Sequence, residues 1–409
     1  MGEGRGKWTR CAKFKGTTVV GAWVTLPRPS FLPLLEAHRD AADTPFRPQV
    51  GTLTGAVIEP GAAIEPVEKP QWGAIVARYQ QPQGLRAVTQ MVTTLVPLTA
   101  VFGLMYLSLA LPYIVTLLLA FPAAGLLVRT FIIMHDCGHG SFFKSRRANE
   151  IVGWITGVLT LTPFAQWRKD HALHHASSGD LDRRGHGDVE TITVKEYVAF
   201  TPRQQRRYRF VRNPLVMLGL GPLYLMLSQR RLLKGTRLND LQHFSVWSTN
   251  LAIIAIIVGF SLWIGLGAFF AIYFPAIFIA ASAGIALFYV QHQFEDTYWH
   301  QHKEWDYATA AIRGSSYFKL HPMLQWFTGN IGLHHVHHLG PRIPNYNLKR
   351  CHDENELFRN VTVLTLAAAV KTLRLGLWDE EHGRLIRFKD FKCGLADPVR
   401  PAPTVIVPG

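Results

Sequence analysis

The chain has 409 residues, a net charge of +15 and 48% hydrophobic residues against 17% charged ones. Its apolar residues are concentrated in a few long runs, which favours an integral membrane protein over a set of soluble domains. The basic residues do not interleave with aromatic ones in a nucleic-acid motif, and positive loops are usual on the cytoplasmic side of membrane proteins, so we expect no nucleic-acid partner.

Residues 1–85 contain many prolines and glycines with little periodicity, so we expect a loosely ordered N-terminal cytosolic arm. Four apolar runs follow, each about long enough to cross the hydrocarbon core as a helix. They cover about residues 88–110, 113–134, 246–265 and 268–291. The connection inside each pair carries no charge, which favours two hairpins whose turns lie on the non-cytoplasmic side.

Two further apolar segments, 151–164 and 214–228, are too short to span and are expected to lie at the membrane interface. The basic stretch 203–209 between them suits either an acidic protein partner or lipid headgroups. After a membrane domain at 86–350, we expect a cytosolic tail at 351–409 that packs on the catalytic face, with an amphipathic helix at 362–375. The predicted fold class is all-α integral membrane, with four transmembrane helices, interfacial helices and a cytosolic helical cap. An even number of crossings places both termini in the cytoplasm.

Histidines form three clusters, two of which directly follow long apolar runs or the loops between them. They are His135 and His139; His171, His174 and His175; and His334, His337 and His338. Spacings of three and four residues place imidazoles on one helix face, and the even number of crossings brings all three clusters to one side of the membrane. About eight imidazoles exceed the four ligands of a tetrahedral zinc site and suit two metal ions with open positions.

Two other histidines adjoin these clusters. His292 ends the fourth run at the same predicted depth as His135, so we expect it to be a further ligand, although an interfacial histidine without a metal is the alternative. His335 lies between ligand positions, so we expect it to support the site without binding metal. Imidazole suits iron, zinc and copper alike, and the chain contains neither HExxH nor GxSxG, so zinc-protease and nucleophile-elbow arrangements are absent.

The strings HDCGHGSFF, HALHHASSGDLDRRGHGD and GNIGLHHVHHLGPRIPNYNL resemble the three histidine boxes of membrane fatty acid desaturases. FYVQHQFEDTYW resembles the segment that gives these enzymes an additional ligand. The likeness runs from about Arg86 into the tail and is strongest with bacterial acyl-lipid desaturases of the delta-5 and delta-12 (omega-6) kind. About the first 80 residues lie outside it.

The resemblance implies an oxygen-dependent oxidoreductase in which two non-haem iron ions use O2 and two electrons to desaturate the acyl chain of a membrane lipid. The implied iron ligands are His135, His139, His171, His174, His175, His292, His334, His337 and His338. Asp136, Asp170, Asn330 and His335 would orient them or hold an iron-bound water. No Asp or Glu is expected to be catalytic, because abstraction of hydrogen from an alkyl chain leaves no role for carboxylate acid-base chemistry.

Electrons are expected from a separate carrier, such as ferredoxin, flavodoxin or cytochrome b5. The haem signature HPGG of a fused cytochrome b5 domain is missing, and no flavin or nicotinamide loop is recognisable. Two other functions compete with desaturation. A related histidine-box oxygenase, such as a carotenoid ketolase or hydroxylase, is less favoured by the flanks GSFF and GPRIPNY. A metal transporter is disfavoured because the apolar runs hold almost no ionisable residues.

Overall fold

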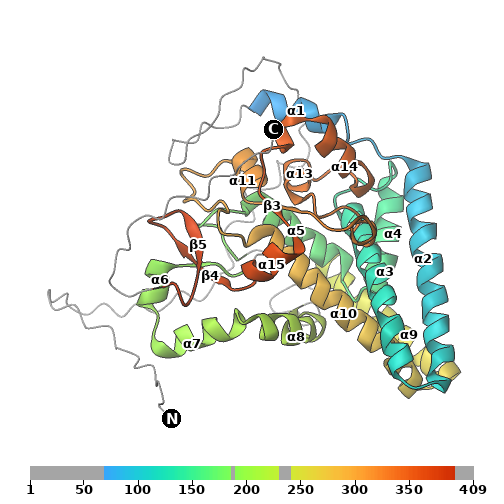
Figure 1. Cartoon of the computed structure of the whole chain (residues 1–409). Helices are drawn as coiled ribbons and strands as arrows, with labels where there is room; N and C mark the ends of the chain where they lie inside the picture. The colour runs from blue at the N-terminus through green and yellow to red at the C-terminus, as the bar shows by residue number, and fades with distance from the viewer. Residues whose placement is uncertain (1–68, 186–188, 230–240, 392–409) are drawn as a thin grey trace, which may run out of the picture. The chain divides into compact units, whose positions relative to one another are not determined.

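The computed structural model describes residues 69–185, 189–229 and 241–391, and most of this part of the chain is helical (Figure 1). Four helices are long and apolar enough to cross a membrane: α2 (Gly84–Leu107), α3 (Ile114–Gly138), α9 (Leu241–Ile264) and α10 (Leu266–His292). These are the four predicted runs. The largest difference in bounds is at α9, which begins at Leu241 rather than at residue 246.

The connections inside the two helix pairs are short. A 3-10 turn, η1 (Ser108–Ala110), leads from α2 towards α3, while Gly265 alone separates α9 from α10. Gly265 has φ +87°, a backbone conformation that glycine adopts without the penalty of a side chain. Helix α2 packs against α3, and α9 against α10, while α3 also packs against α10.

Small residues shape the contact between α3 and α10. Ala120, Ala123 and Ala124 of α3 share a buried cluster with Ile272 and Ala276 of α10. Small side chains let helix backbones approach closely, which is the usual way that helices associate in membranes. The close approach brings together the ends of the two helices, where both carry a histidine.

Shorter helices surround this pair. They are α4 (Arg146–Leu159), α5 (Phe164–Ser177), α6 (Val194–Ala199), α7 (Pro202–Val211) and α8 (Pro214–Tyr224), the last followed by a π-helical turn, η2 (Leu225–Gln229). The segment from α8 to Leu227 bends 78° from α7. Both segments predicted to be interfacial are therefore mainly helical. The first, 151–164, forms most of α4 and reaches the start of α5, and the second, 214–228, begins with α8.

A second group of helices lies towards the C-terminus: α11 (Tyr307–Arg313), α12 (Pro322–Phe327), α13 (His334–Leu339) and α14 (Asn345–Glu354). The 3-10 turn η3 (Glu356–Phe358) follows them. The N-terminal helix α1 (Lys69–Ala77) joins their core, since Val76 and Tyr79 pack in one buried cluster with Val336 and Leu339. The last part of the predicted arm is therefore ordered, and residues 1–68 lie outside the described part of the chain.

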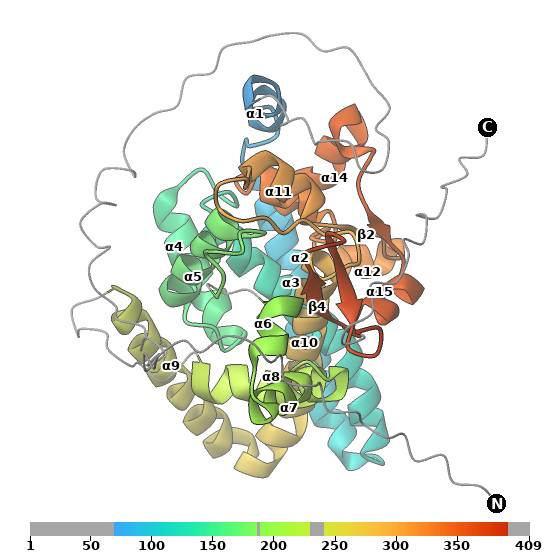
Figure 2. The ribbon, with the colours of Figure 1, turned by 90° about the vertical axis from the view of Figure 1, so that its left-hand side faces the viewer.

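Two small sheets depart from the all-α prediction. One has the order β1 (Ile192–Thr193), β4 (Leu375–Asp379), β5 (Arg384–Arg387), with β1 parallel and β5 antiparallel to β4. The other pairs β2 (Tyr317–Phe318) in parallel with β3 (Val363–Leu364). Figure 2 shows β4 beside α6 and close to α15 (Leu366–Thr372).

The helix predicted at 362–375 is therefore wrong at both ends. Its centre forms α15, but Val363 and Leu364 pair with β2, and Leu375 begins β4. The parallel partners of these strands, β2 and β1, lie far away in sequence, and the helical period of the tail carries no information about them; β4 also pairs with β5 in the same tail. Residues 392–409 of the predicted tail lie outside the described part.

Candidate metal centre

Four elements carry the nine histidines predicted to bind metal. His135 and His139 stand at the end of α3, His292 ends α10, and the remaining six lie on α5 and α13. The sequence predicted the helix of the second cluster from near residue 166, and α5 begins at Phe164. The structure brings all nine imidazoles together.

The imidazoles form two groups, in each of which the candidate ligand nitrogens lie within 4.8 Å of one another. The first group contains His135, His139, His171 and His337; the second contains His174, His292, His334 and His338. In the first, Nε2 of His171 is 3.1 Å from Nε2 of His135. In the second, Nε2 of His292 is 3.2 Å from that of His174 and 2.9 Å from that of His334.

His175 lies between the two groups. Its Nε2 is 3.1 Å from Nε2 of His171 and 3.0 Å from that of His337, both in the first group. Its ring stacks on His338 of the second group, with centroids 4.2 Å apart. One imidazole therefore connects the two groups.

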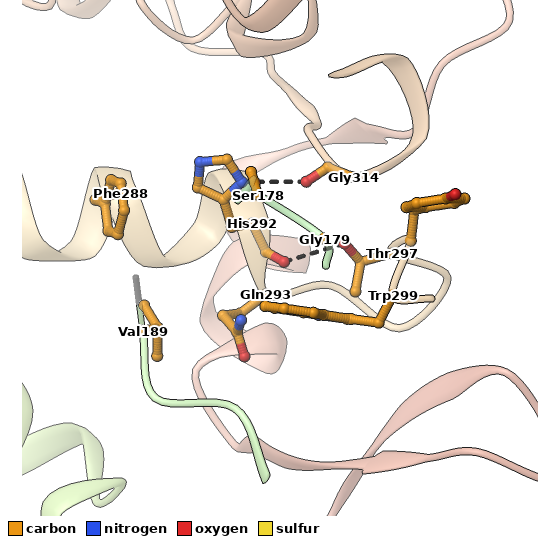
Figure 3. Close-up of a pocket in the computed structure, with 10 residues that line it drawn as sticks. Ser178, Gly179, Val189, Phe288, His292, Gln293, Thr297, Trp299 and Gly314 are labelled. Carbon is orange, nitrogen blue, oxygen red and sulfur yellow. Dashed lines mark hydrogen bonds between the residues drawn. The ribbon is translucent and has the colours of Figure 1, made fainter. Parts of the chain in front are cut away.

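Neighbouring groups fix the orientation of two of these rings. Nδ1 of His135 is 3.0 Å from the Asp136 carboxylate, whose other oxygen accepts hydrogen bonds from the backbone and side-chain nitrogens of Asn345. Nδ1 of His292 is 3.1 Å from the carbonyl oxygen of Gly314, as Figure 3 shows. A proton on Nδ1 leaves the lone pair on Nε2, where the other imidazoles converge.

The charge state of the cluster suits metal binding. Burial, and after it the neighbouring imidazoles, hold the pKa of six histidines well below the ordinary value. These are His139, His171, His175, His334, His337 and His338. Neutral imidazole is the form that binds metal. Nε2 of His139 is buried and has no hydrogen-bond partner among the described residues, which is expected of a nitrogen whose partner is a metal ion.

The residues present thus fit two cations. Four ring nitrogens converge in each of two sets, and one further imidazole lies between the sets. Neutral imidazoles carry too few protons for all of these nitrogens to form hydrogen bonds with one another. Nitrogen donors without thiolates or carboxylates suit a divalent transition metal rather than calcium or magnesium. The structure therefore supports a metal centre with two positions.

The other predicted supporting residues differ in where they lie. Asp136 contacts His135 directly, whereas the Asp170 carboxylate accepts from the side chain of Gln166 at 3.0 Å. Asn330 adopts φ +58° in the turn before α13, a conformation that asparagine tolerates better than most residues. Nε2 of His335 is directed to Nδ1 of His352 at 3.1 Å, and burial lowers the pKa of His335 to about 3.

Two aromatic side chains beside the centre were not predicted. Trp167 stacks on His171 with centroids 4.4 Å apart, and Phe288 lies 5.0 Å from the ring of His174 and 5.1 Å from that of His292. Each stands four residues before a histidine on the same helix. The i, i+4 spacing that identified the histidine faces could have identified these two residues as well.

A small cavity borders the second group (Figure 3). Its wall includes Phe288, His292, Gln293, Thr297 and Trp299. The hydroxyl of Thr297 donates to the carbonyl oxygen of His292 at 3.1 Å. The Gln293 side chain is held at both ends, since it accepts from Arg212 at 2.9 Å and donates to Thr191 at 3.0 Å. The aromatic rings of Phe288 and Trp299 therefore share the wall of this cavity with hydrogen-bonded polar side chains.

Comparison with known proteins agrees with this site. The model of the fatty acid desaturase family matches residues 108–360, a range that contains all nine histidines. The fatty acid desaturase of Bacillus subtilis is 44% identical over 318 residues, which cover 78% of this chain and 90% of that protein. The chain therefore belongs to the fatty acid desaturase family, and it is an oxidoreductase that desaturates fatty acyl chains.

More distant relatives carry more specific names. An Arabidopsis thaliana chloroplastic sn-2 acyl-lipid omega-3 desaturase (ferredoxin) is 27% identical over 232 residues, 53% of this chain and 50% of the relative. An endoplasmic-reticulum acyl-lipid omega-3 desaturase (cytochrome b5) of the same species is 27% identical over 237 residues, 53% of this chain and 58% of the relative. The matches do not favour the alternative of a carotenoid-type oxygenase.

Proposed function

We propose that this protein is an acyl-lipid desaturase that uses O2 and two electrons at a diiron centre to place a double bond in the acyl chain of a membrane lipid. The observation that carries the proposal is the convergence of eight imidazoles into two groups, with a ninth between them, at the adjoining ends of α3 and α10. Relatives whose names specify acyl-lipid substrates support a lipid-linked chain rather than a soluble thioester.

The two groups divide the ligands between two iron ions. His135, His139, His171 and His337 would hold one ion; His174, His292, His334 and His338 would hold the other, with His175 in contact with both groups. The chemistry that such a centre supplies is oxidation by O2, in which two hydrogen atoms leave neighbouring methylenes and, with two electrons and two protons from outside, water forms.

The protein's own residues orient the site and keep it dry. Asp136 and the Gly314 carbonyl hold the rings of His135 and His292 in place, so that their lone pairs stay directed inwards. Phe288, whose ring lies against His174 and His292, shields the second group from water and offers an apolar surface to the methylenes.

The membrane arrangement is part of the proposal. The helix pairs α2–α3 and α9–α10 are two transmembrane hairpins, with α4 and α8 at the interface and with the histidines and both termini on the cytoplasmic side. Exposed apolar side chains such as Leu118 of α3 and Leu251 of α9 then face lipid. The proposal keeps the domain limits predicted from the sequence, which are an arm at 1–85, a membrane domain at 86–350 and a cytosolic tail at 351–409 that packs on the catalytic face.

A separate protein supplies the electrons in this scheme. The names of two relatives specify ferredoxin and cytochrome b5, and a flavodoxin would serve the same chemistry. The carrier meets the enzyme on the cytoplasmic side, where the histidines lie.

Two measurements test the proposed function. Metal analysis of the purified protein should find two iron ions per chain, and expression in a host without polyunsaturated lipids, with a reductant system supplied, should yield acyl chains with a new double bond. One zinc per chain would overturn the mechanism. The absence of any new double bond from correctly inserted protein would overturn the function.

A further inference from the structure

Trp167 packs directly against two histidines of the first group. Its indole is stacked on His171, at an angle of 21° and with centroids 4.4 Å apart, and lies 5.5 Å from the ring of His135. A side chain at Gly138 would come within 2.9 Å of this indole, so the glycine leaves the space that the ring fills. The indole is also partly exposed, so it connects the histidines with the surface.

Three cations are exposed at the start of the neighbouring helix. Lys144 lies just before α4, and Arg146 and Arg147 lie in its first turn. No carboxylate of the described residues forms an ion pair with the three cations of α4. We call Lys144, Arg146 and Arg147, together with Trp167, the α4–α5 face.

Two contacts join α4 and α5 into this single face. Arg168, next to Trp167, forms an ion pair with Glu150 in the first turns of α4. Further along, the ring of Phe164 lies so close to Gly153 that no larger side chain would fit there. The cations of α4 are therefore held near the indole of α5.

We propose that the α4–α5 face docks a small acidic one-electron carrier and that Trp167 conducts each electron to the first histidine group. The inference rests on the proposed function, which requires an external carrier. Each encounter oxidises the carrier by one electron and reduces the metal centre by one. No bond forms or breaks, and two encounters supply the two electrons of one turnover.

An acidic protein fits this face better than lipid headgroups do. Ile151 and Ile155, the exposed apolar residues of α4, lie in the part of the helix beyond the cations, so α4 turns its apolar surface to lipid one turn or more away from them. The stacking of the Trp167 indole on His171, a candidate metal ligand, has no function in the binding of lipid headgroups. The three cations at the start of α4 and the partly exposed aromatic ring of α5 provide electrostatic steering and a path for the electron on one surface.

The helix α7 offers a matched control. Arg206 and Arg207 are also exposed cations, but the helix that carries them is fastened through Tyr208 to Gly376 in the C-terminal sheet, at 2.7 Å. Reversal of two charges on α7 changes the net charge of the protein as much as reversal of two charges on α4. Any difference between the two double variants therefore reports the place of docking.

Docking is tested with the full-length protein in nanodiscs of neutral phosphatidylcholine, with a plant-type [2Fe–2S] ferredoxin as the probe. The Arg146→Glu/Arg147→Glu variant should raise the Kd of the carrier about tenfold and weaken its dependence on salt, while Arg206→Glu/Arg207→Glu should leave it nearly unchanged. An equal or larger effect on α7 would overturn the proposal. A second result would also overturn it: the α4 variant keeps the carrier Kd of the wild type but binds more weakly to vesicles that contain phosphatidylglycerol. The face would then bind lipid headgroups.

The path of the electron is tested by anaerobic stopped-flow oxidation of the reduced carrier. Trp167→Leu should slow this oxidation about tenfold or more without a change in carrier Kd or iron content, whereas Trp167→Phe, which keeps a ring, should lose less. Reduction by dithionite should be equal in both variants. An unchanged rate in Trp167→Leu would overturn the role of the indole. If the wild-type protein binds no iron and oxidises no carrier, the proposed function fails. If the wild-type protein does both and the variants behave as it does, this inference alone fails.

Discussion

The two histidine groups have similar ligands in different surroundings. His139 and His171 of the first group are partly exposed, and the first group adjoins Trp167 and the cations of the α4–α5 face. All four histidines of the second group are buried, and that group adjoins Phe288 and the cavity. Under the two proposals above, electrons would enter beside the first group and the acyl chain would lie beside the second.

The groups also differ in what holds their imidazoles. His135 of the first group is held by a carboxylate, and Asn345 in turn holds that carboxylate with two hydrogen bonds. His292 of the second group is held by the backbone carbonyl of Gly314. A carboxylate makes its imidazole a stronger donor than a carbonyl does. A side-chain substitution can therefore remove the carboxylate that orients His135, but it cannot remove the backbone carbonyl that orients His292.

The largest effect is expected from the loss of one ligand in each group. His171→Ala and His334→Ala should each abolish desaturation and lower the metal content by about one ion per chain, because each removes a donor from a different position. Inductively coupled plasma mass spectrometry measures the content, with His300→Ala as a control outside the centre. Loss of both ions from each single variant would contradict two separable positions.

A smaller effect is expected from Asp136→Asn. The amide cannot stabilise the His135 ring as the carboxylate does, so the affinity of the first group for metal should fall about 10- to 100-fold while the second group keeps its ion. Competition with a metal chelator measures both affinities. Asp170→Asn is the matched control, because its carboxylate bonds to Gln166. An equal loss from both groups would remove the distinction between them.

Phe288 tests the other side of the comparison. Phe288→Ala removes the ring that contacts His174 and His292, so the acyl chain should sit less firmly, and the product should contain double bonds at more than one position. Gas chromatography with double-bond mapping would show this while metal content stays unchanged. Phe274→Ala, at an exposed position of the same helix, should leave the product as it is. A single, unaltered product from Phe288→Ala would place the acyl chain elsewhere.

The sequence predicted the collection of histidines but not their division. Apolar run length identified the four long helices, and spacings of three and four residues identified the histidine faces. Those spacings predict one face per helix, yet His171 belongs to the first group and His174 to the second. The division arises because the helices interleave, and so it depends on how α5 and α13 pack against α3 and α10. A local period contains no such information.

The strands and the supporting contacts show the same limit. β3 pairs with β2, more than forty positions earlier, so no pattern inside the tail could have predicted that strand, whereas β4 pairs both with the distant β1 and with β5 in the same tail. His292 was within reach of prediction because its position depends only on the length of one helix. Its partner Gly314 was not, because a backbone carbonyl leaves no mark in the residue type.

The smallest effect concerns a histidine that belongs to neither group. His335 lies on α13 among the ligands, but it bonds to His352 and packs near Phe358, with ring centroids 5.7 Å apart. His335→Ala should keep both metal ions and most of the activity but lower the free energy of unfolding by about 1–3 kcal/mol, because it leaves a cavity and an unpaired His352 nitrogen. Thermal unfolding and metal content measure the two consequences, and His352→Ala, at a less buried position, should cost less. Loss of an ion from His335→Ala would make this histidine a ligand, and the two groups would no longer account for the centre.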